Sequence, residues 1–392
     1  MNKRLLQPEI QDFINESLTA NFSKLALQKN PFPEVPWSDI LTQLGCKIKA
    51  KDKLPTWFEC ENILYPSKIS LEQTSSEITA KYKAGLVEGK TLIDLTGGFG
   101  VDDYYFAKKI NRVVHCELKH ELSTIVSHNL EALKISNIEC IDKDSSIVLK
   151  ELNQQFDWIY IDPSRRNDAK GKVFMLKDCL PNVPENLDFY FSFSNNILIK
   201  TAPILDISAG LSELKNVKEI HIVAVNNEVK ELLWVIEKGF DNDTIIKTIN
   251  FNKETEEKFD FNLNQLPENN TYSLPQTYLY EPNSAILKSG AFDLIPSKFN
   301  LEKLHQHSHL YTSDHLINFT GRRFEIKNCF EYNKKEMKQF LENSKANITT
   351  RNFPETVDYI RKKWKIKDGG DVYTFFTTDM NNNKIVLICD KI

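Results

Sequence analysis

Hydrophobic and polar positions follow two different patterns along the chain. From residue 1 to about residue 85, apolar side chains recur at helical spacing, as between Ile10 and Leu18, and the proline-rich piece Pro31–Pro36 interrupts this pattern. We therefore predict a helical amino-terminal region over residues 1–85. Its last predicted helix runs from Leu71 to Leu86.

Beyond residue 90, short apolar runs alternate with longer amphipathic segments. The predicted strands are Thr91–Leu95, Val113–Glu117, Ile138–Ile141, Trp158–Ile161, Ile197–Lys200 and Ile220–Val225. The predicted helices are Val101–Lys109, His120–Leu133, Ser146–Leu152 and one through Trp234. Strands separated by helices predict right-handed βαβ units and a mainly parallel sheet with helices on both faces.

The fold class that we predict is α/β, with a doubly wound, Rossmann-like sheet. The helical region precedes this sheet, and a small α+β domain follows it at the carboxyl end. A polar segment without periodicity, Asn264–Asn270, marks a linker. We expect domains at residues 1–85, 86–262 and 321–392, with a small ferredoxin-like or connecting module at 275–320.

Composition excludes several classes of protein. With 41% hydrophobic and 27% charged residues among 392, the chain is not largely disordered. No apolar run approaches the roughly 18 residues of a membrane span, and the basic amino end lacks the long apolar core of a secretory signal. Seven scattered cysteines without a CxxC motif predict neither a disulfide framework nor a zinc ribbon. We expect a protein of the reducing cytoplasm.

Charge is distributed unevenly. The net charge is −4, but residues 282–392 contain 18 Lys and Arg against 13 Asp and Glu, an excess of +5. Such an excess is compatible with a phosphate-bearing partner, and equally with a solvated face.

The most informative segment begins at Thr91, where an apolar strand ends in Asp94 and a glycine-rich turn leads into a helix. A dinucleotide-binding GxGxxG turn that began at Gly97 would place glycines at positions 99 and 102, where this chain has Phe99 and Asp102. No Gly-Lys-Ser/Thr of a P-loop follows. A strand-terminal Asp before the first glycine instead suits a ligand with a cationic amino group, such as the ammonium of a methionine moiety.

Acidic residues at the ends of the next strands extend this pattern. Glu117 lies 23 residues after Asp94, where a carboxylate can accept both ribose hydroxyls of a nucleoside. Asp144 follows the third strand, where a carboxylate can meet an adenine amino group. The fourth strand leads to Asp162 and Pro163.

With these residues, the region from about Leu71 to Phe251 resembles a class I S-adenosylmethionine-dependent methyltransferase. The glycine turn matches the first motif of the family, Glu117 its ribose acid, Asp144 its adenine-side acid and Asp162-Pro163 its catalytic loop. The resemblance implies S-adenosylmethionine as cofactor. The residues expected to bind it are Asp94, Thr96, Gly97, Gly98, Gly100, Glu117, Asp144 and Asp162.

The loop after the fourth strand resembles the Asp/Asn-Pro-Pro-aromatic loop of amino methyltransferases. In that family the acid and a following carbonyl hold the target amine with its lone pair toward the methyl group. The expected catalytic residues are Asp162, Pro163, Ser164 and Arg165. Ser164 and Arg165 replace the second proline and the aromatic of the family, so the stacking residue stays open among Tyr160, Phe174 and Phe191.

A second resemblance concerns the carboxyl half. The loop Asp162–Arg166, together with Glu72–Ala84, Lys200–Pro203 and Tyr278–Ile286, resembles bacterial methyltransferases with a THUMP-like carboxyl domain. These resemble, more distantly, the cap guanine-N2 (trimethylguanosine synthase) methyltransferases. Residues from Gly321 to Gly370 match the THUMP-like segment.

This resemblance implies methylation of a base nitrogen in structured RNA, either tRNA or rRNA. The expected substrate-binding residues are Arg166, Arg361, Lys362, Lys363 and Trp364, which combine positive charge with an aromatic ring. The alternatives are a methyltransferase for DNA, protein or a small molecule, and a non-catalytic RNA-binding protein with a degenerate methyltransferase fold. We expect no metal, because His305, His307, His309 and His315 have no accompanying cysteine.

Overall fold

The computed structural model describes residues 2–165, 175–253, 255–268 and 270–392. These residues form two compact units. The first comprises residues 1–218 and 232–242, and the second comprises residues 219–231 and 243–392. The chain thus passes between the units three times, so no single linker separates them.

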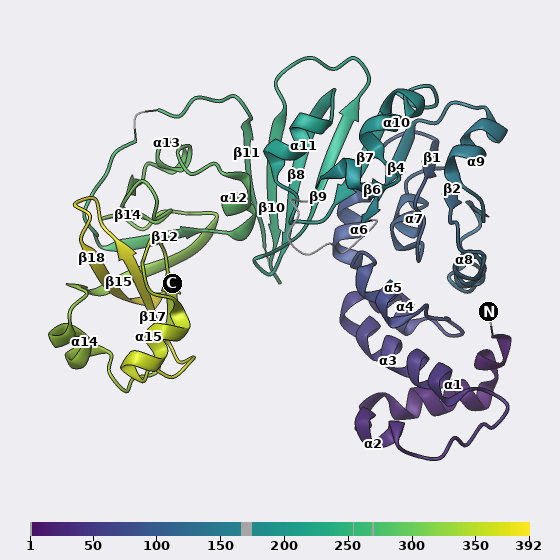
Figure 1. Cartoon of the computed structure of the whole chain (residues 1–392), viewed down its shortest axis with the longest axis horizontal. Helices are drawn as coiled ribbons and strands as arrows, with labels where there is room; N and C mark the ends of the chain where they lie inside the picture. The colour runs from purple at the N-terminus through teal and green to yellow at the C-terminus, as the bar shows by residue number, and fades with distance from the viewer. Residues whose placement is uncertain (1, 166–174, 254, 269) are drawn as a thin grey trace. The chain divides into compact units, whose positions relative to one another are not determined.

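The first unit begins with a helical region, drawn in purple to dark blue in Figure 1. Its helices are α1 (Pro8–Glu16), α2 (Phe22–Ala26), α3 (Trp37–Lys53), α4 (Pro55–Glu59), α5 (Lys68–Gln73) and α6 (Glu77–Ala84). Their apolar faces form a core around Ile10, Ile40 and Leu44, against which Ile125 of the sheet region packs. The single helix predicted over Leu71–Leu86 is wrong. It is two helices, because the side chain of Ser76 accepts a hydrogen bond from the backbone N–H of Thr79 and so starts α6 anew.

The sheet of the first unit has the order β7-β4-β1-β2-β3, with β9 antiparallel to β7 at one end. The parallel strands are β1 (Thr91–Asp94), β2 (Arg112–Cys116), β3 (Ile138–Ile141), β4 (Trp158–Ile161) and β7 (Asn196–Thr201), and β9 spans Glu228–Glu237. The intervening helices are α7 (Val101–Phe106), α8 (His120–Ala132), α9 (Ser145–Leu152), α10 (Val183–Tyr190) and α11 (Ile207–Glu213). Two further short strands, β5 (Ser164–Arg165) and β6 (Cys179–Leu180), pair antiparallel with each other.

The strands and helices predicted between residues 91 and 161 are confirmed within a few residues, and so is the α/β fold class. The helix predicted through Trp234 is wrong, because this residue lies in β9. Leu232, Leu233, Trp234 and Ile236 are completely buried, so the apolar run faces protein on both sides and shows neither helical nor alternating periodicity.

The second unit holds two groups of strands. In the first, β8 (Val217–Val225) pairs in parallel with β10 (Ile245–Phe251), which pairs antiparallel with β11 (Glu256–Asn262). The second is a sheet with the order β13-β14-β12-β15-β18-β17-β16. Its strands are β12 (Tyr278–Pro282), β13 (Glu302–Lys303), β14 (Tyr311–Ser313), β15 (Gly321–Glu331), β16 (Asn347–Thr350), β17 (Val372–Thr378) and β18 (Lys384–Lys391). The helices of this unit are α12 (Ser284–Ser289), α13 (Ile295–Phe299), α14 (Lys334–Phe340) and α15 (Val357–Trp364).

Candidate active site

The turn between β1 and α7 has no room for a side chain at Gly97 or Gly100. A Cβ atom on Gly97 would meet the imidazole of His115 at 2.2 Å, and one on Gly100 would meet Val126 at 2.8 Å. Gly98 and Gly100 also have φ angles of 58° and 71°, which glycine adopts without a steric penalty. The turn therefore exposes backbone instead of side chains at the carboxyl end of β1, where open α/β sheets bind ligands.

Asp94, at the end of β1, lies beneath this turn. Only 2% of the residue is exposed, and its Oδ1 accepts hydrogen bonds from the backbone N–H and the hydroxyl of Thr96, at 2.7 and 3.0 Å. Burial and the neighbouring carboxylate of Asp103 raise the pKa of Asp94 well above its usual range. Asp94 therefore stabilises the shape of the turn through its hydrogen bonds to Thr96.

Two buried residues that sequence analysis missed support the turn from below. Asp103 of α7 and His115 of β2 are both completely buried, and the Nδ1 of His115 lies 2.6 Å from the Oδ2 of Asp103. Burial lowers the pKa of His115, which favours the neutral imidazole. The only signal in the sequence is a His in an otherwise apolar strand, and that alone does not distinguish a structural role from a functional one.

Glu117 follows β2 and faces the glycine turn. Its carboxylate accepts hydrogen bonds from the backbone N–H groups of Gly98, at 3.1 Å, and Lys119, at 2.8 Å. These contacts fix the carboxylate of Glu117 beside the turn. Asp144, in contrast, caps α9 by accepting a hydrogen bond from the backbone N–H of Ser146 at 2.9 Å. Capping of the helix is a structural role for Asp144 that needs no ligand.

Asp162 follows β4, next to β1 in the sheet, and its side chain is 35% exposed. Its backbone N–H donates to the hydroxyl of Thr96 at 2.7 Å, so Thr96 connects the loop after β4 with Asp94. Its carboxylate pairs with the ammonium of Lys200 at 2.5 Å, and the side chain of Lys200 is 14% exposed. Lys200 lies near the end of β7, the next strand of the sheet.

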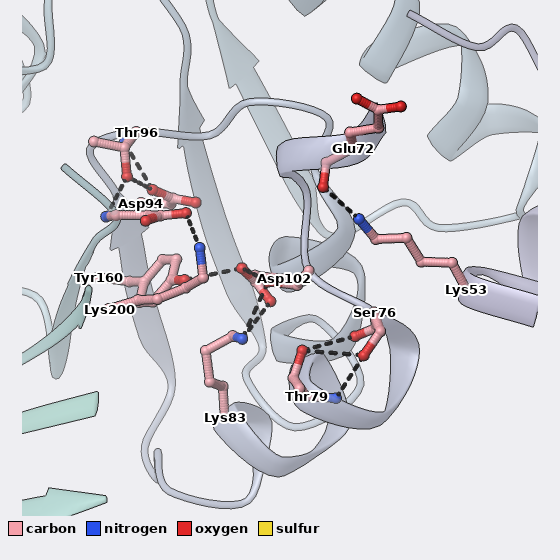
Figure 2. Close-up of polar contacts among 12 residues, drawn as sticks. Lys53, Glu72, Ser76, Thr79, Lys83, Asp94, Thr96, Asp102, Tyr160 and Lys200 are labelled. Carbon is pink, nitrogen blue, oxygen red and sulfur yellow. Dashed lines mark hydrogen bonds and ion pairs between the residues drawn. The ribbon is translucent and has the colours of Figure 1, made fainter. Parts of the chain in front are cut away.

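A buried polar network lies next to these loops. The completely buried Lys83 of α6 lies 3.3 Å from the carboxylate of Asp102 in α7, which also accepts hydrogen bonds from Ser75 and Tyr160, each at 2.8 Å. Figure 2 shows Lys83 and Tyr160 on two sides of Asp102. The network ties the amino-terminal region to α7 and β4, so it holds the two loops in register.

Of the three aromatic residues considered for base stacking, Tyr160 and Phe191 are buried, so their rings cannot stack on a base. Tyr160 is 1% exposed and its ring packs on Phe106 at 5.0 Å, and Phe191 is 5% exposed. Phe174 and Arg166 lie outside the described residues. Pro163 is buried, whereas Ser164 is exposed and begins β5 together with Arg165.

The predicted RNA-binding cluster lies on α15 and is largely engaged within its own domain. Arg361 pairs with Asp368 at 2.5 Å, and Lys363 pairs with Glu355 at 2.8 Å. Lys362 is exposed. Trp364 is 6% exposed, belongs to the core and donates a hydrogen bond to Tyr332, so its ring does not face a base.

Across the described ranges of the chain, no three His, Cys, Asp or Glu residues are arranged to hold a metal ion. Within the same ranges, no helix combines the length and apolarity that crossing a bilayer requires.

The site described so far fits S-adenosylmethionine. Three glycines lie in the turn after β1, a carboxylate held by backbone N–H groups follows β2, and the partly exposed acid Asp162 follows the neighbouring strand β4. A family model for a ferredoxin-like domain matches residues 278–319, and one for a THUMP-like domain matches residues 321–391. The chain therefore combines an α/β sheet domain with a carboxyl segment that matches the THUMP-like family model.

The solved structures that it resembles include a candidate methyltransferase from Porphyromonas gingivalis W83. That protein is 29% identical, covers 100% of this chain over 98% of its own length, and superimposes with a TM-score of 0.84. An rRNA methylase from Streptococcus thermophilus is 16% identical over 41% of this chain and 94% of its own, with a TM-score of 0.30. The SAM-dependent methyltransferase from Agrobacterium tumefaciens is 17% identical over 32% of this chain and 43% of its own, with a TM-score of 0.25. Among functionally curated proteins, none matches the sequence.

Proposed function

We propose that this protein transfers the methyl group of S-adenosylmethionine to a base nitrogen of a structured RNA, either tRNA or rRNA. The observation that carries the proposal is the position of Asp162. Its partly exposed carboxylate lies just after β4, and its backbone N–H is linked through Thr96 to the turn that would hold the cofactor. The excess of positive charge after residue 282 and the THUMP-like match support RNA as substrate.

The roles of the residues follow from their surroundings. The turn Gly97–Gly100 would cradle the methionine end of the cofactor, and Glu117 would accept the ribose hydroxyls. Bound S-adenosylmethionine supplies a methyl group that is already activated. Asp162 would accept a hydrogen bond from an N–H of the target amine, so that the lone pair of the amine nitrogen points toward that methyl group. Lys200 would hold the carboxylate in place. Positioning of this kind is worth several orders of magnitude in rate.

Two measurements test the proposal. Calorimetry should detect binding of S-adenosylhomocysteine to the purified protein. Transfer of labelled methyl groups to RNA should then fall by about 10²–10⁴ in Asp162→Ala, with nearly unchanged affinity for S-adenosylhomocysteine. Asp188→Ala is a suitable control, because Asp188 also pairs with a lysine, Lys215, but its side chain is 81% exposed on α10.

The accepting nucleoside is identified by mass spectrometry of RNA from wild-type and deletion cells. A nucleoside that is missing in the deletion strain and restored by the wild-type gene, but not by Asp162→Ala, supports the proposal. Full transfer by Asp162→Ala would overturn the role of this loop. Binding of RNA without any methyl transfer would favour the non-catalytic alternative.

A further inference from the structure

Two arginines of the second unit share one buried carboxylate. Glu281 of β12 is 2% exposed and lies directly opposite Arg322 of β15 in the antiparallel register. The Nε of Arg322 donates to Oε2 of Glu281 at 2.6 Å, and the Nε and Nη2 of Arg351 donate to Oε1 at 3.1 and 2.8 Å. Each carboxylate oxygen is thus bound by one guanidinium.

This arrangement leaves positive charge in excess. One arginine is enough to neutralise Glu281, so the trio carries a net charge of +1. The side chains of Arg322 and Arg351 are 32% and 31% exposed, and neither Nη1 has a hydrogen-bond partner among the residues that the structure describes. A partly buried excess charge costs free energy unless an anion offsets it.

The two guanidiniums are also held in place before any ligand arrives. That of Arg322 lies 5.5 Å from the ring centre of Phe324 and 6.0 Å from that of Phe375. A Cβ atom on Gly321 would meet the carbonyl oxygen of Glu281 at 2.3 Å, so β15 approaches β12 closely just before Arg322. Preorganised donors lose less entropy when they bind, and paired guanidiniums match the oxygens of a phosphate.

Helix α15, which sequence analysis predicted to bind RNA, has less positive charge in excess of its paired acids. Arg361 and Lys363 of α15 each have an acid of their own, Asp368 and Glu355, so those pairs are neutral. The trio around Glu281, in contrast, combines two arginines with a single acid in a fixed geometry.

We propose that Arg322 and Arg351 form a binding site for a backbone phosphate of RNA. The inference rests on the proposed function for the identity of the ligand, and it replaces α15 by these arginines as the main phosphate contact of the second unit. A phosphodiester oxygen would bridge the outer edges of the two guanidiniums and offset the excess charge.

The test compares single variants that keep Glu281 paired. Arg322→Gln and Arg351→Gln each leave one arginine on the carboxylate, and Lys338→Gln removes an exposed charge of α14 in the same unit as the matched control. Binding of bulk tRNA is measured between 0.05 and 0.3 M KCl. For each arginine variant we expect about ten-fold weaker binding at about 0.1 M salt, and a log–log salt slope that is smaller by about 0.7–0.9. Lys338→Gln should change the affinity less than about three-fold.

Further measurements distinguish a loss of phosphate binding from misfolding and from a simple loss of charge. Unchanged thermal unfolding shows that a variant is folded, and Arg351→Lys, which keeps the charge, should retain the salt slope but bind more weakly. Wild-type affinity and slope in both folded glutamine variants would overturn the inference. Displacement of tRNA by about 1 mM inorganic phosphate at constant ionic strength would also overturn it, because the site would then serve a small anion.

Methyl transfer is measured separately from binding. If the wild type methylates RNA and the arginine variants bind it normally, only the phosphate site is wrong. If the arginine variants bind RNA weakly but the wild type transfers no methyl group, the proposed function is wrong and the phosphate site stands.

Discussion

At the scale of single residues, the shape of the loop after β1 depends on a buried acid, Asp94. Asp94 is buried and accepts two hydrogen bonds from Thr96, whereas Glu117 faces the turn. Replacing each of the two acids should therefore weaken cofactor binding to a different degree. Asp94→Ala removes the acceptor that shapes the turn and should abolish binding of S-adenosylhomocysteine in calorimetry. Glu117→Ala should weaken binding by about 1–3 kcal/mol, the size of a lost hydrogen-bond pair to a charged group.

Glu139 provides the control for this pair. It lies on the neighbouring strand β3 and pairs with Arg112, and both side chains are well exposed. Glu139→Ala should bind S-adenosylhomocysteine like the wild type. Binding by Asp94→Ala at wild-type affinity would contradict the structural role of the buried acid.

Lys200 should affect turnover and not cofactor affinity. Its ammonium fixes the Asp162 carboxylate from the adjacent strand, so Lys200→Met frees that carboxylate to turn toward solvent. We expect turnover to fall by about 10–100-fold, because misplacement of a positioning group by about 1 Å has a cost of this size. Lys200→Arg should recover part of the loss. Steady-state kinetics with RNA, next to calorimetry with S-adenosylhomocysteine, separates the two effects, and unchanged turnover in Lys200→Met would show that the pair is only structural.

Sequence analysis identified the residues at strand ends but not those beneath them. Asp94, Glu117 and Asp162 stand out because acids end apolar strands at regular intervals. Lys200 and Asp103 act through contacts across the sheet, which depend on the strand order and not on sequence spacing. Sequence analysis included Lys200 only as part of the segment Lys200–Pro203, which resembles a family of methyltransferases, and gave it no role.

At the scale of elements, the strands and helices near the site were predictable because their apolar runs are bounded by turn residues. β9 was not, because burial on both faces removes the periodicity that separates a strand from a helix. The break between α5 and α6 depends on a serine cap, which a helical pattern of apolar residues does not reveal.

The loop between β13 and β14 should make stability depend on pH. Burial, with Lys303, Arg351 and His307 nearby, lowers the pKa of His309 to about 4, and Asp293 opposes the shift. The ordinary value is about 6.5, so the unfolded chain binds the proton first as the pH falls. The contribution of neutral His309 is therefore complete above about pH 6.5 and is lost between about pH 6.5 and 4. For this half-buried ring we expect a loss on the order of 1 kcal/mol.

His309→Asn tests this dependence. The φ angle at position 309 is 53°, a conformation that asparagine tolerates. Urea unfolding at several pH values should show a shallower loss of stability in the variant than in the wild type. The variant also loses the stacking of His309 on Phe292, so the slope against pH, and not the absolute stability, is the quantity to compare. Equal slopes would contradict the shifted pKa.

At the scale of the whole molecule, the sheet of the second unit crosses a boundary between two sequence families. The ferredoxin-like match ends at residue 319 and the THUMP-like match begins at residue 321, but β12 from the first pairs along five residues with β15 from the second. Leu279 of β12 packs in one core with Phe324 and Phe375. The two matched segments therefore share one sheet and one core, which the family boundaries alone do not indicate.

A chain that ends at residue 320 should lose the ferredoxin-like fold as well. The truncation removes the strand that covers β12, exposes the core around Leu279 and leaves the buried Glu281 without either of its arginines. An uncovered strand edge and an unpaired buried acid each destabilise a small domain. We expect limited proteolysis to cut between residues 278 and 320 in the truncated chain but not in the full chain. Asp94, Glu117 and Asp162 all belong to the other unit, so binding of S-adenosylhomocysteine should persist within about three-fold. A protease-resistant segment 278–320 in the truncated chain would show that the ferredoxin-like part folds by itself.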